Sequence, residues 1–222
     1  MRNHLVILSA ALFALSACNQ RPVTPPTVPP ARLLAGTAEG WTGGAATAAA
    51  ERFDGDGNVA FTFAEGEVGA DGRFSLELPE SVPDAQLTEV TTGEDFGCAS
   101  AGVTISAGSY RTAGFGELSV RQGGADLGFL SLSSSYPFAA YEGNAVGDVF
   151  VSREYADRAV FLTGTCTFED GAQDTFDLNL QPGWNAVSYT VTGVTPAGDI
   201  ASGVFRAGAP ENVRWFFVPS AE

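Results

Sequence analysis

One string in the sequence has the spacing of a metal site. It is Asp54-Gly-Asp56-Gly-Asn58, with Glu65 at the twelfth position counted from Asp54. Oxygen ligands at the first, third, fifth and twelfth positions are those of a helix-loop-helix calcium site. The sixth position, however, is Val59 where such a loop needs glycine, and alternating β-sequence follows in place of a helix. Because this composition is also typical of a turn, we predict a turn without a metal. A weak calcium site at Asp54, Asp56, Asn58 and Glu65 is the alternative.

The sequence lacks the residues that most catalytic mechanisms require. It has no lysine, and its single histidine, His4, lies in a segment expected to be removed. Ser-His-Asp and Cys-His catalysis, histidine-ligated zinc, lysine Schiff bases and P-loops are therefore excluded. Hydrolysis by a pair of carboxylates that flank a cleft remains possible. Asp and Glu are spread over the whole chain, however, so the sequence does not indicate which two would form the pair. We therefore predict that the protein is not an enzyme, with no catalytic residues and no cofactor.

Three cysteines are present, Cys18, Cys98 and Cys166. An exported protein meets an oxidising compartment, and two cysteines are enough for one bridge. We expect Cys98 and Cys166 to form a disulfide between the linker and the larger β part, while Cys18 carries lipid. Two free, buried thiols are the alternative.

Residues 1–17 have the layout of an export signal, with Arg2 as the positive start and an apolar run from Leu5 to Leu15. That run is shorter than the roughly 20 residues that span a membrane. The string Leu-Ser-Ala-Cys ending at Cys18 resembles the lipobox of bacterial lipoproteins. The resemblance implies a diacylglycerol on Cys18 and an extracytoplasmic, lipid-anchored place in the cell envelope. An ordinary signal peptide with a chance cysteine is the alternative.

The rest of the chain predicts a mainly β protein with little helix outside the signal peptide. Residues 18–31 are a proline-rich tether. Alternation such as Phe74, Leu76 and Leu78 against polar neighbours indicates half-buried strands. Residues 45–52 are ambiguous because alanines favour helix, but their neighbours favour a strand. The predicted parts are a small β unit over 32–80, a linker over 81–100 with one helical turn near 84–92, and an antiparallel β-sandwich-like domain over 101–222.

Two further resemblances follow from short motifs. The string A-D-G-R-F-S-L-E-L-P, after the candidate strand 33–41, resembles carboxypeptidase-regulatory-like modules, which have a transthyretin-like β-sandwich and are usually not catalytic. The strings G-W-T-G-G-A-A, Y-A-D-R and G-W-N resemble an uncharacterised family of exported bacterial lipoproteins. Neither resemblance implies an activity.

Charge and aromatic residues limit the partners. The net charge of −15 makes nucleic acid and anionic membrane surfaces poor partners, since both need basic patches. Trp184 and Trp215 are expected in the core, because aromatics on strands usually fill it. Tyr136 and Tyr141 lie in a Pro/Gly loop, and loops often carry binding residues. These two tyrosines are the predicted ligand contacts.

Three classes of function compete at this stage. The first is a non-catalytic envelope lipoprotein, tethered to a membrane, that serves as a structural or interaction module and contacts another envelope protein. The second is a glycan-binding module, for which exposed aromatic rings would provide the platform. The third is a carboxylate-dependent hydrolase, which needs a cleft holding two acids.

Overall fold

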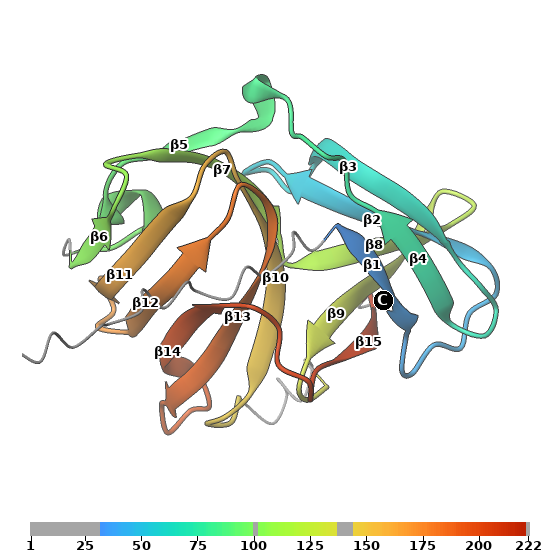
Figure 1. Cartoon of the computed structure of the whole chain (residues 1–222). Coiled ribbons are helices and arrows are strands. Elements are labelled where there is room, and N and C mark those ends of the chain that lie inside the picture. Colours follow the sequence, from blue (N-terminus) through green and yellow to red (C-terminus); the bar gives the residue numbers. More distant parts are fainter. Residues whose placement is uncertain (1–31, 100–101, 137–143, 221–222) are drawn as a thin grey trace, which may run out of the picture.

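The computed structural model describes residues 32–99, 102–136 and 144–220. This part holds fifteen β-strands, two short 3-10 helices and no α-helix (Figure 1), which confirms the prediction of a mainly β protein. None of its helices has the length and hydropathy needed to cross a membrane. The elements are β1 (Leu33–Thr37), β2 (Ala46–Phe53), β3 (Val59–Val68), β4 (Arg73–Glu77), η1 (Asp84–Gln86), β5 (Thr88–Val90), η2 (Gly93–Phe96), β6 (Val103–Ile105), β7 (Tyr110–Phe115), β8 (Glu117–Gln122), β9 (Ala125–Ser133), β10 (Val149–Ala156), β11 (Val160–Thr167), β12 (Gln173–Leu180), β13 (Gly183–Val194), β14 (Ile200–Ala207) and β15 (Arg214–Pro219).

All these strands belong to one hydrogen-bonded sheet, which is mostly antiparallel. Its main path is β1-β4-β3-β2-β8-β9-β10-β13-β14-β12-β11-β6, with β15 on β9, and with β7 on β10 and β5. Among the described pairs of strands, β12 and β14 run parallel. Strands from residues 32–80 and from residues 101–222 lie in the same sheet, because β2 pairs with β8.

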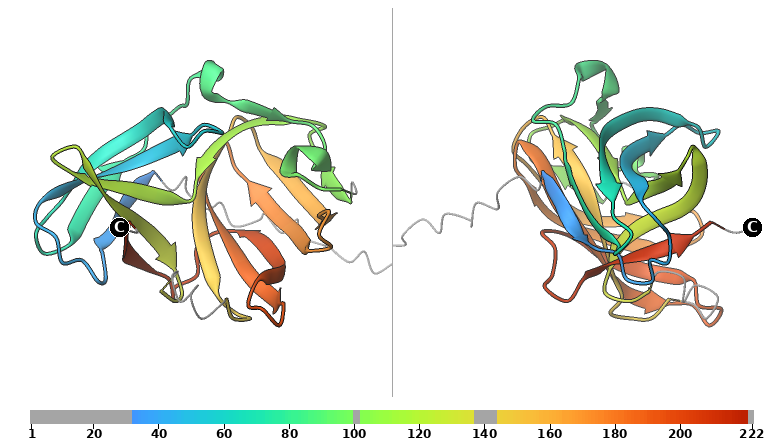
Figure 2. Two further views of the ribbon diagram at one scale, coloured as in Figure 1. Left: turned by 180° about the vertical axis from the view of Figure 1, so that it is seen from behind. Right: turned by 90° about the vertical axis from the view of Figure 1, so that its right-hand side faces the viewer.

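The first half of the sheet closes on itself. Strands β1, β4, β3, β2, β8, β9 and β15 follow one another, and a parallel bridge between Glu39 and Phe216 joins the two ends. There the Glu39 amide donates to the Trp215 carbonyl at 2.8 Å, and the Phe217 amide donates to the Glu39 carbonyl at 2.9 Å. Alternate side chains of these strands fill the interior with one apolar cluster. Figures 1 and 2 show these strands curving around that interior.

The second half is an open, strongly curved surface made of β6, β11, β12, β14, β13, β10, β7 and β5 (Figure 1). Its concave face carries a second apolar cluster, which includes Leu162, Phe176, Leu178 and Val187. Strand β10 joins the halves, since it pairs with β9 on one side and with β13 and β7 elsewhere. Its odd residues Val149 and Val151 belong to the first cluster, so its even residues face the concave surface of the second half.

Several local predictions can be compared with these elements. The ambiguous segment 45–52 forms strand β2, as predicted, and its small alanines at 46, 48 and 50 are buried inside the closed half. The predicted helical turn near 84–92 is the 3-10 helix η1, and a second one, η2, follows. Strands β5, β6 and β7 were not predicted. The first two have only three residues each, too few to show a period.

The segment 81–100 does more than connect. It contributes Val90 and Cys98 to the second apolar cluster, where both are buried. A disulfide joins Cys98 to Cys166 of β11, so the predicted bridge between this segment and the later β part is present. Next to it, the Ala99 amide donates to the Thr167 carbonyl at 2.8 Å. These contacts hold η2 against the concave side of the second half.

Candidate functional site

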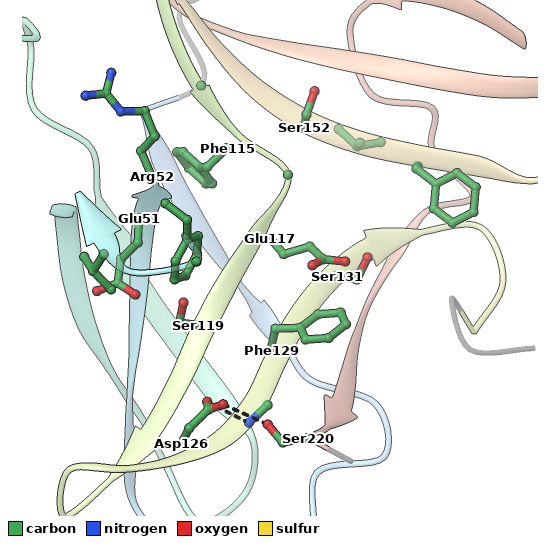
Figure 3. A pocket seen from close by; sticks show the side chains of 18 of the residues that line it. Glu51, Arg52, Phe115, Glu117, Ser119, Asp126, Phe129, Ser131, Ser152 and Ser220 are labelled. Carbon is green, nitrogen blue, oxygen red and sulfur yellow. Dashed lines mark hydrogen bonds between the residues drawn. The ribbon is translucent and has the colours of Figure 1, made fainter. Parts of the chain in front are cut away.

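A cleft of about 780 Å³ lies where the outer face of the closed half meets the open half (Figure 3). Strands β8 and β9 supply one wall and β10, β13 and β14 supply the other. Phe53 and Val59, which pair across the β2–β3 hairpin, lie at its rim and are 49% and 42% exposed. The walls combine carboxylates, hydroxyls and aromatic rings, and the residues used below are Glu51, Phe115, Glu117, Ser119, Arg121, Asp126, Phe129, Ser131, Phe150, Tyr189, Phe205 and Ser220.

Glu51 is the most buried carboxylate of the cleft. It follows a register shift in β2 and is only 4% exposed. Arg121 of β8 donates to both of its oxygens, from Nη1 to Oε1 at 2.8 Å and from Nη2 to Oε2 at 2.6 Å. Burial alone would raise the pKa of Glu51, but the hydrogen bonds from Arg121 and Ser119 outweigh it and hold the pKa below its usual value. Glu51 is therefore an ionised, fully paired carboxylate.

Glu117 has a different environment. It starts β8 and points toward Ser131 of β9, beside the Phe129 ring (Figure 3). Desolvation by the surrounding residues raises the pKa of Glu117, although the hydrogen bond with Ser131 acts in the opposite direction. No arginine forms an ion pair with it among the described residues. Glu117 is therefore a carboxyl group that remains available to a ligand.

Asp126 lies at the far end of the cleft, and its carboxylate forms hydrogen bonds that stabilise the fold. Its Oδ1 accepts the Gly128 amide at 3.2 Å and its Oδ2 accepts the Ser220 hydroxyl at 2.9 Å (Figure 3). Gly128 has φ +134°, and a Cβ there would overlap the Val218 carbonyl. A glycine is needed at this point because β15 passes so close to it.

Aromatic rings cover much of the remaining wall. Phe115, Phe129, Phe150, Tyr189 and Phe205 are partly exposed there. The Tyr189 ring packs against Gly203, where a Cβ would overlap it, and its hydroxyl donates to Asp174 at 2.8 Å. Partly exposed rings next to hydroxyls and carboxylates give a surface that can stack and hydrogen-bond at the same time.

Comparison with known proteins gives no identification. No family model, no curated protein and no solved structure matches the chain. The functional assignment therefore rests on the chemistry of the cleft.

The predicted calcium residues are only partly brought together. The Asp54 Oδ1 accepts the backbone amides of Asp56 and Asn58, at 3.0 and 2.9 Å, as in an ordinary turn. These hydrogen bonds, that from Asn58 first, lower the pKa of Asp54. Glu65 lies along β3 opposite Ala49, about 20 Å further along the chain at ~3.3 Å per residue. Within the described residues, no three His, Cys, Asp or Glu side chains are placed to hold a metal.

The predicted aromatic residues fall in different places. Trp184 and Trp215 are buried, with exposed fractions of 0% and 9%, which confirms their core role. Tyr136 is 40% exposed and its ring packs edge-on against Phe216. Tyr141 and the expected lipidation residue Cys18 lie outside the described residues. Tyr136 does not line the cleft.

The main cleft residues were missed by the sequence reasoning. Glu117, Ser119 and Arg121 do alternate with the apolar Leu118 and Val120, which indicates a polar outer face on this strand. This alternation shows that the three polar side chains share one face of the strand, but it does not show which strands lie opposite that face. The opposite wall comes from strands more than twenty residues later, and no local pattern predicts which strands will meet.

Proposed function

We propose that this protein is a non-catalytic, extracytoplasmic binding module that holds a neutral glycan in the cleft. The observation that carries the proposal is the Glu117–Ser131 pair beside the Phe129 ring. A sugar presents hydroxyls at its edge and C–H groups on its face. The Glu117 carboxyl can bind the edge, and the ring next to it can stack on the face. Ser131 is only 4% exposed, so its hydrogen bond holds the Glu117 carboxyl in place.

Charge narrows the ligand class. The chain has a net charge of −15 and Glu51, Glu117 and Asp126 all line the cleft. Two arginines also line the cleft: Arg121 is paired with Glu51, and Arg52 donates to the backbone and side-chain oxygens of Gln86. The three carboxylates outnumber them. An anionic polysaccharide would be repelled by this field, so a neutral glycan fits best.

Two features of the cleft favour binding over hydrolysis. Glycoside hydrolysis needs two carboxyl groups on opposite sides of the scissile bond, one as acid and one as base or nucleophile. Both oxygens of Glu51 are paired with Arg121, and both oxygens of Asp126 accept hydrogen bonds from the fold. Glu117 alone does not make such a pair.

A glycan-binding test compares two phenylalanines. Phe129→Ala removes the ring beside Glu117, while Phe161→Ala is a matched control at an exposed ring on β11 that does not line the cleft. Affinity electrophoresis in gels containing a β-glucan, a xylan or a dextran is the measurement. We expect Phe129→Ala and Glu117→Gln to weaken retention about tenfold, which corresponds to about 1.4 kcal/mol.

The control should leave retention unchanged. The proposal fails if the unchanged protein is retarded by none of these polysaccharides, or if both phenylalanine variants lose retention equally. Crosslinking in intact cells then addresses the interaction-module alternative. Capture of one envelope protein, unaffected by Phe129→Ala, would favour that alternative.

The tether and anchor complete the proposal. We propose that Cys18 carries the lipid and that residues 18–31 hold the β structure away from the membrane. The Cys98–Cys166 disulfide supports an extracytoplasmic place, because such bridges form in oxidising compartments.

The anchor is tested by Cys18→Ala. Two or three acyl chains hold a protein firmly, at about 0.8 kcal/mol per buried methylene, so we expect the variant to move from the membrane to the soluble envelope fraction. Metabolic labelling with a fatty acid should mark only the unchanged protein. Continued membrane association without a label would show that the anchor assignment is wrong.

A further inference from the structure

A second cavity, of about 260 Å³, lies on the concave face of the open half. Five aromatic rings line it, and each comes from a different part of the chain. They are Phe96 of η2, Tyr110 of β7, Phe168 after β11, Phe176 of β12 and Phe205 of β14. Phe176 packs against Phe96 and Phe205 at centroid distances of 4.9 and 5.0 Å. Together with the aliphatic side chains of Leu178, Leu180 and Val187, these rings enclose the cavity as a cage.

Glu154 brings a carboxylate into this cage. It lies on β10 opposite Gly114 of β7, where a Cβ would collide with its Oε2. The missing side chain at Gly114 gives the carboxylate room to lie across β7. There its Oε1 accepts a hydrogen bond from the Thr112 hydroxyl. The side chain lines the cavity together with Tyr110.

No protein cation neutralises Glu154 in the described residues. The cavity lining contains no arginine, and the chain has no lysine. The adjacent Arg153 points to the opposite face of β10, as alternation requires, and is buried there. A carboxylate removed from water without a cation is costly, so the site favours a positively charged occupant.

Two observations indicate an organic cation rather than a metal ion. Hard metal ions need several oxygen ligands, and the described residues hold no group of three metal-binding side chains. Aromatic faces attract alkylated ammonium groups through cation–π interactions, and a cage of rings is the usual way to bind them. We propose that this cavity binds a quaternary or otherwise alkylated ammonium group between Glu154 and the surrounding rings.

The groups that face Glu154 set its pH dependence. They are Tyr110 and Thr112 of β7 and Asp174 of β12, and Asp174 accepts a hydrogen bond from the Tyr189 hydroxyl of β13. None of them is a cation. Burial raises the pKa of Glu154 to about 7, and the hydrogen bond from Thr112 only partly opposes this. The ionised form is therefore complete above this pH and is lost as the pH falls below it, so affinity for a cation must fall in the same direction.

The test uses choline and its uncharged analogue 3,3-dimethylbutan-1-ol, titrated into the full mature chain at pH 8 by calorimetry. We expect choline to bind and the analogue to bind at least tenfold more weakly. Glu154→Gln, which keeps the shape and the hydrogen bond to Thr112, should weaken choline at least tenfold. Lowering the pH from 8 to 6 should weaken choline binding to the unchanged protein but not to Glu154→Gln.

Two further variants separate this site from other effects. Asp177→Asn changes an exposed carboxylate of the same strand as Asp174 and should not alter choline binding. Phe176→Leu removes a ring and keeps an apolar side chain, so choline should lose more affinity than the analogue.

Absence of choline binding to the unchanged protein, or equal binding by Glu154→Gln, would overturn the proposal. Glycan retention should be unaffected by Glu154→Gln, and choline binding unaffected by Phe129→Ala, so each proposal can fail alone.

Discussion

Replacing Trp184 with alanine is expected to lower the free energy of unfolding by about 3–5 kcal/mol, the range for large aromatic residues in cores. Trp184 is fully buried. Its ring makes edge contacts with Phe63, Phe115 and Tyr155 at centroid distances of 5.2 to 5.7 Å. Its indole N–H donates to the Pro79 carbonyl at 3.0 Å. The substitution leaves both a cavity and an unpaired carbonyl.

The position of Trp184 makes this loss affect the whole molecule. The residue comes from β13 of the open half but packs in the cluster of the closed half. Urea denaturation followed by circular dichroism measures the change without depending on tryptophan fluorescence. Phe161→Ala, at an exposed ring, is the control and should shift stability by no more than about 0.5 kcal/mol. A loss below 1 kcal/mol for Trp184→Ala would contradict the central packing role.

Removing the disulfide is expected to cost up to about 4 kcal/mol, from the entropy of closing a loop of this length in the unfolded chain. The two cysteines are 68 residues apart in sequence and both are buried. The double variant Cys98→Ala/Cys166→Ala avoids free thiols. Equilibrium urea unfolding of this variant, compared with the oxidised protein, gives the difference.

Loss of the disulfide should also have a local effect. The bridge holds the segment that carries Phe96, which lines the cage around Glu154. Amide hydrogen exchange in residues 93–99 should therefore speed up in the double variant more than in β2 or β8. Equal stability of the two forms, with no change in exchange, would show that the bridge contributes little to the fold.

Local patterns in the sequence predict most of the strands because alternation follows from burial of one face. Phe74 and Leu76 of β4 are buried and their polar neighbours are exposed, as the pattern indicates. Strand β7 was missed because Arg111 and Thr112 interrupt its alternation. In the structure, both are used for polar contacts, Arg111 with Asp157 and Thr112 with Glu154.

The candidate sites were harder to predict for a different reason. Glu154 sits beside Arg153 in the sequence, and nothing in the local pattern marks it as a binding residue. Alternation along β10 sends the two side chains to opposite faces. Only the pairing of β10 with β7 places Glu154 over Gly114 and next to Tyr110. Long-range strand pairing of this kind leaves no signal in a single sequence.

The bridge between Glu39 and Phe216 has a consequence for the order of folding. The closed half needs β15, which comes near the other end of the described chain, before β9 is paired on both sides. Until then β9 offers an unpaired edge that can associate with other chains. Such distant pairings make folding slow. The early strands therefore remain incompletely paired until β15 has formed, and in this interval the chain is most exposed to aggregation and to proteolysis.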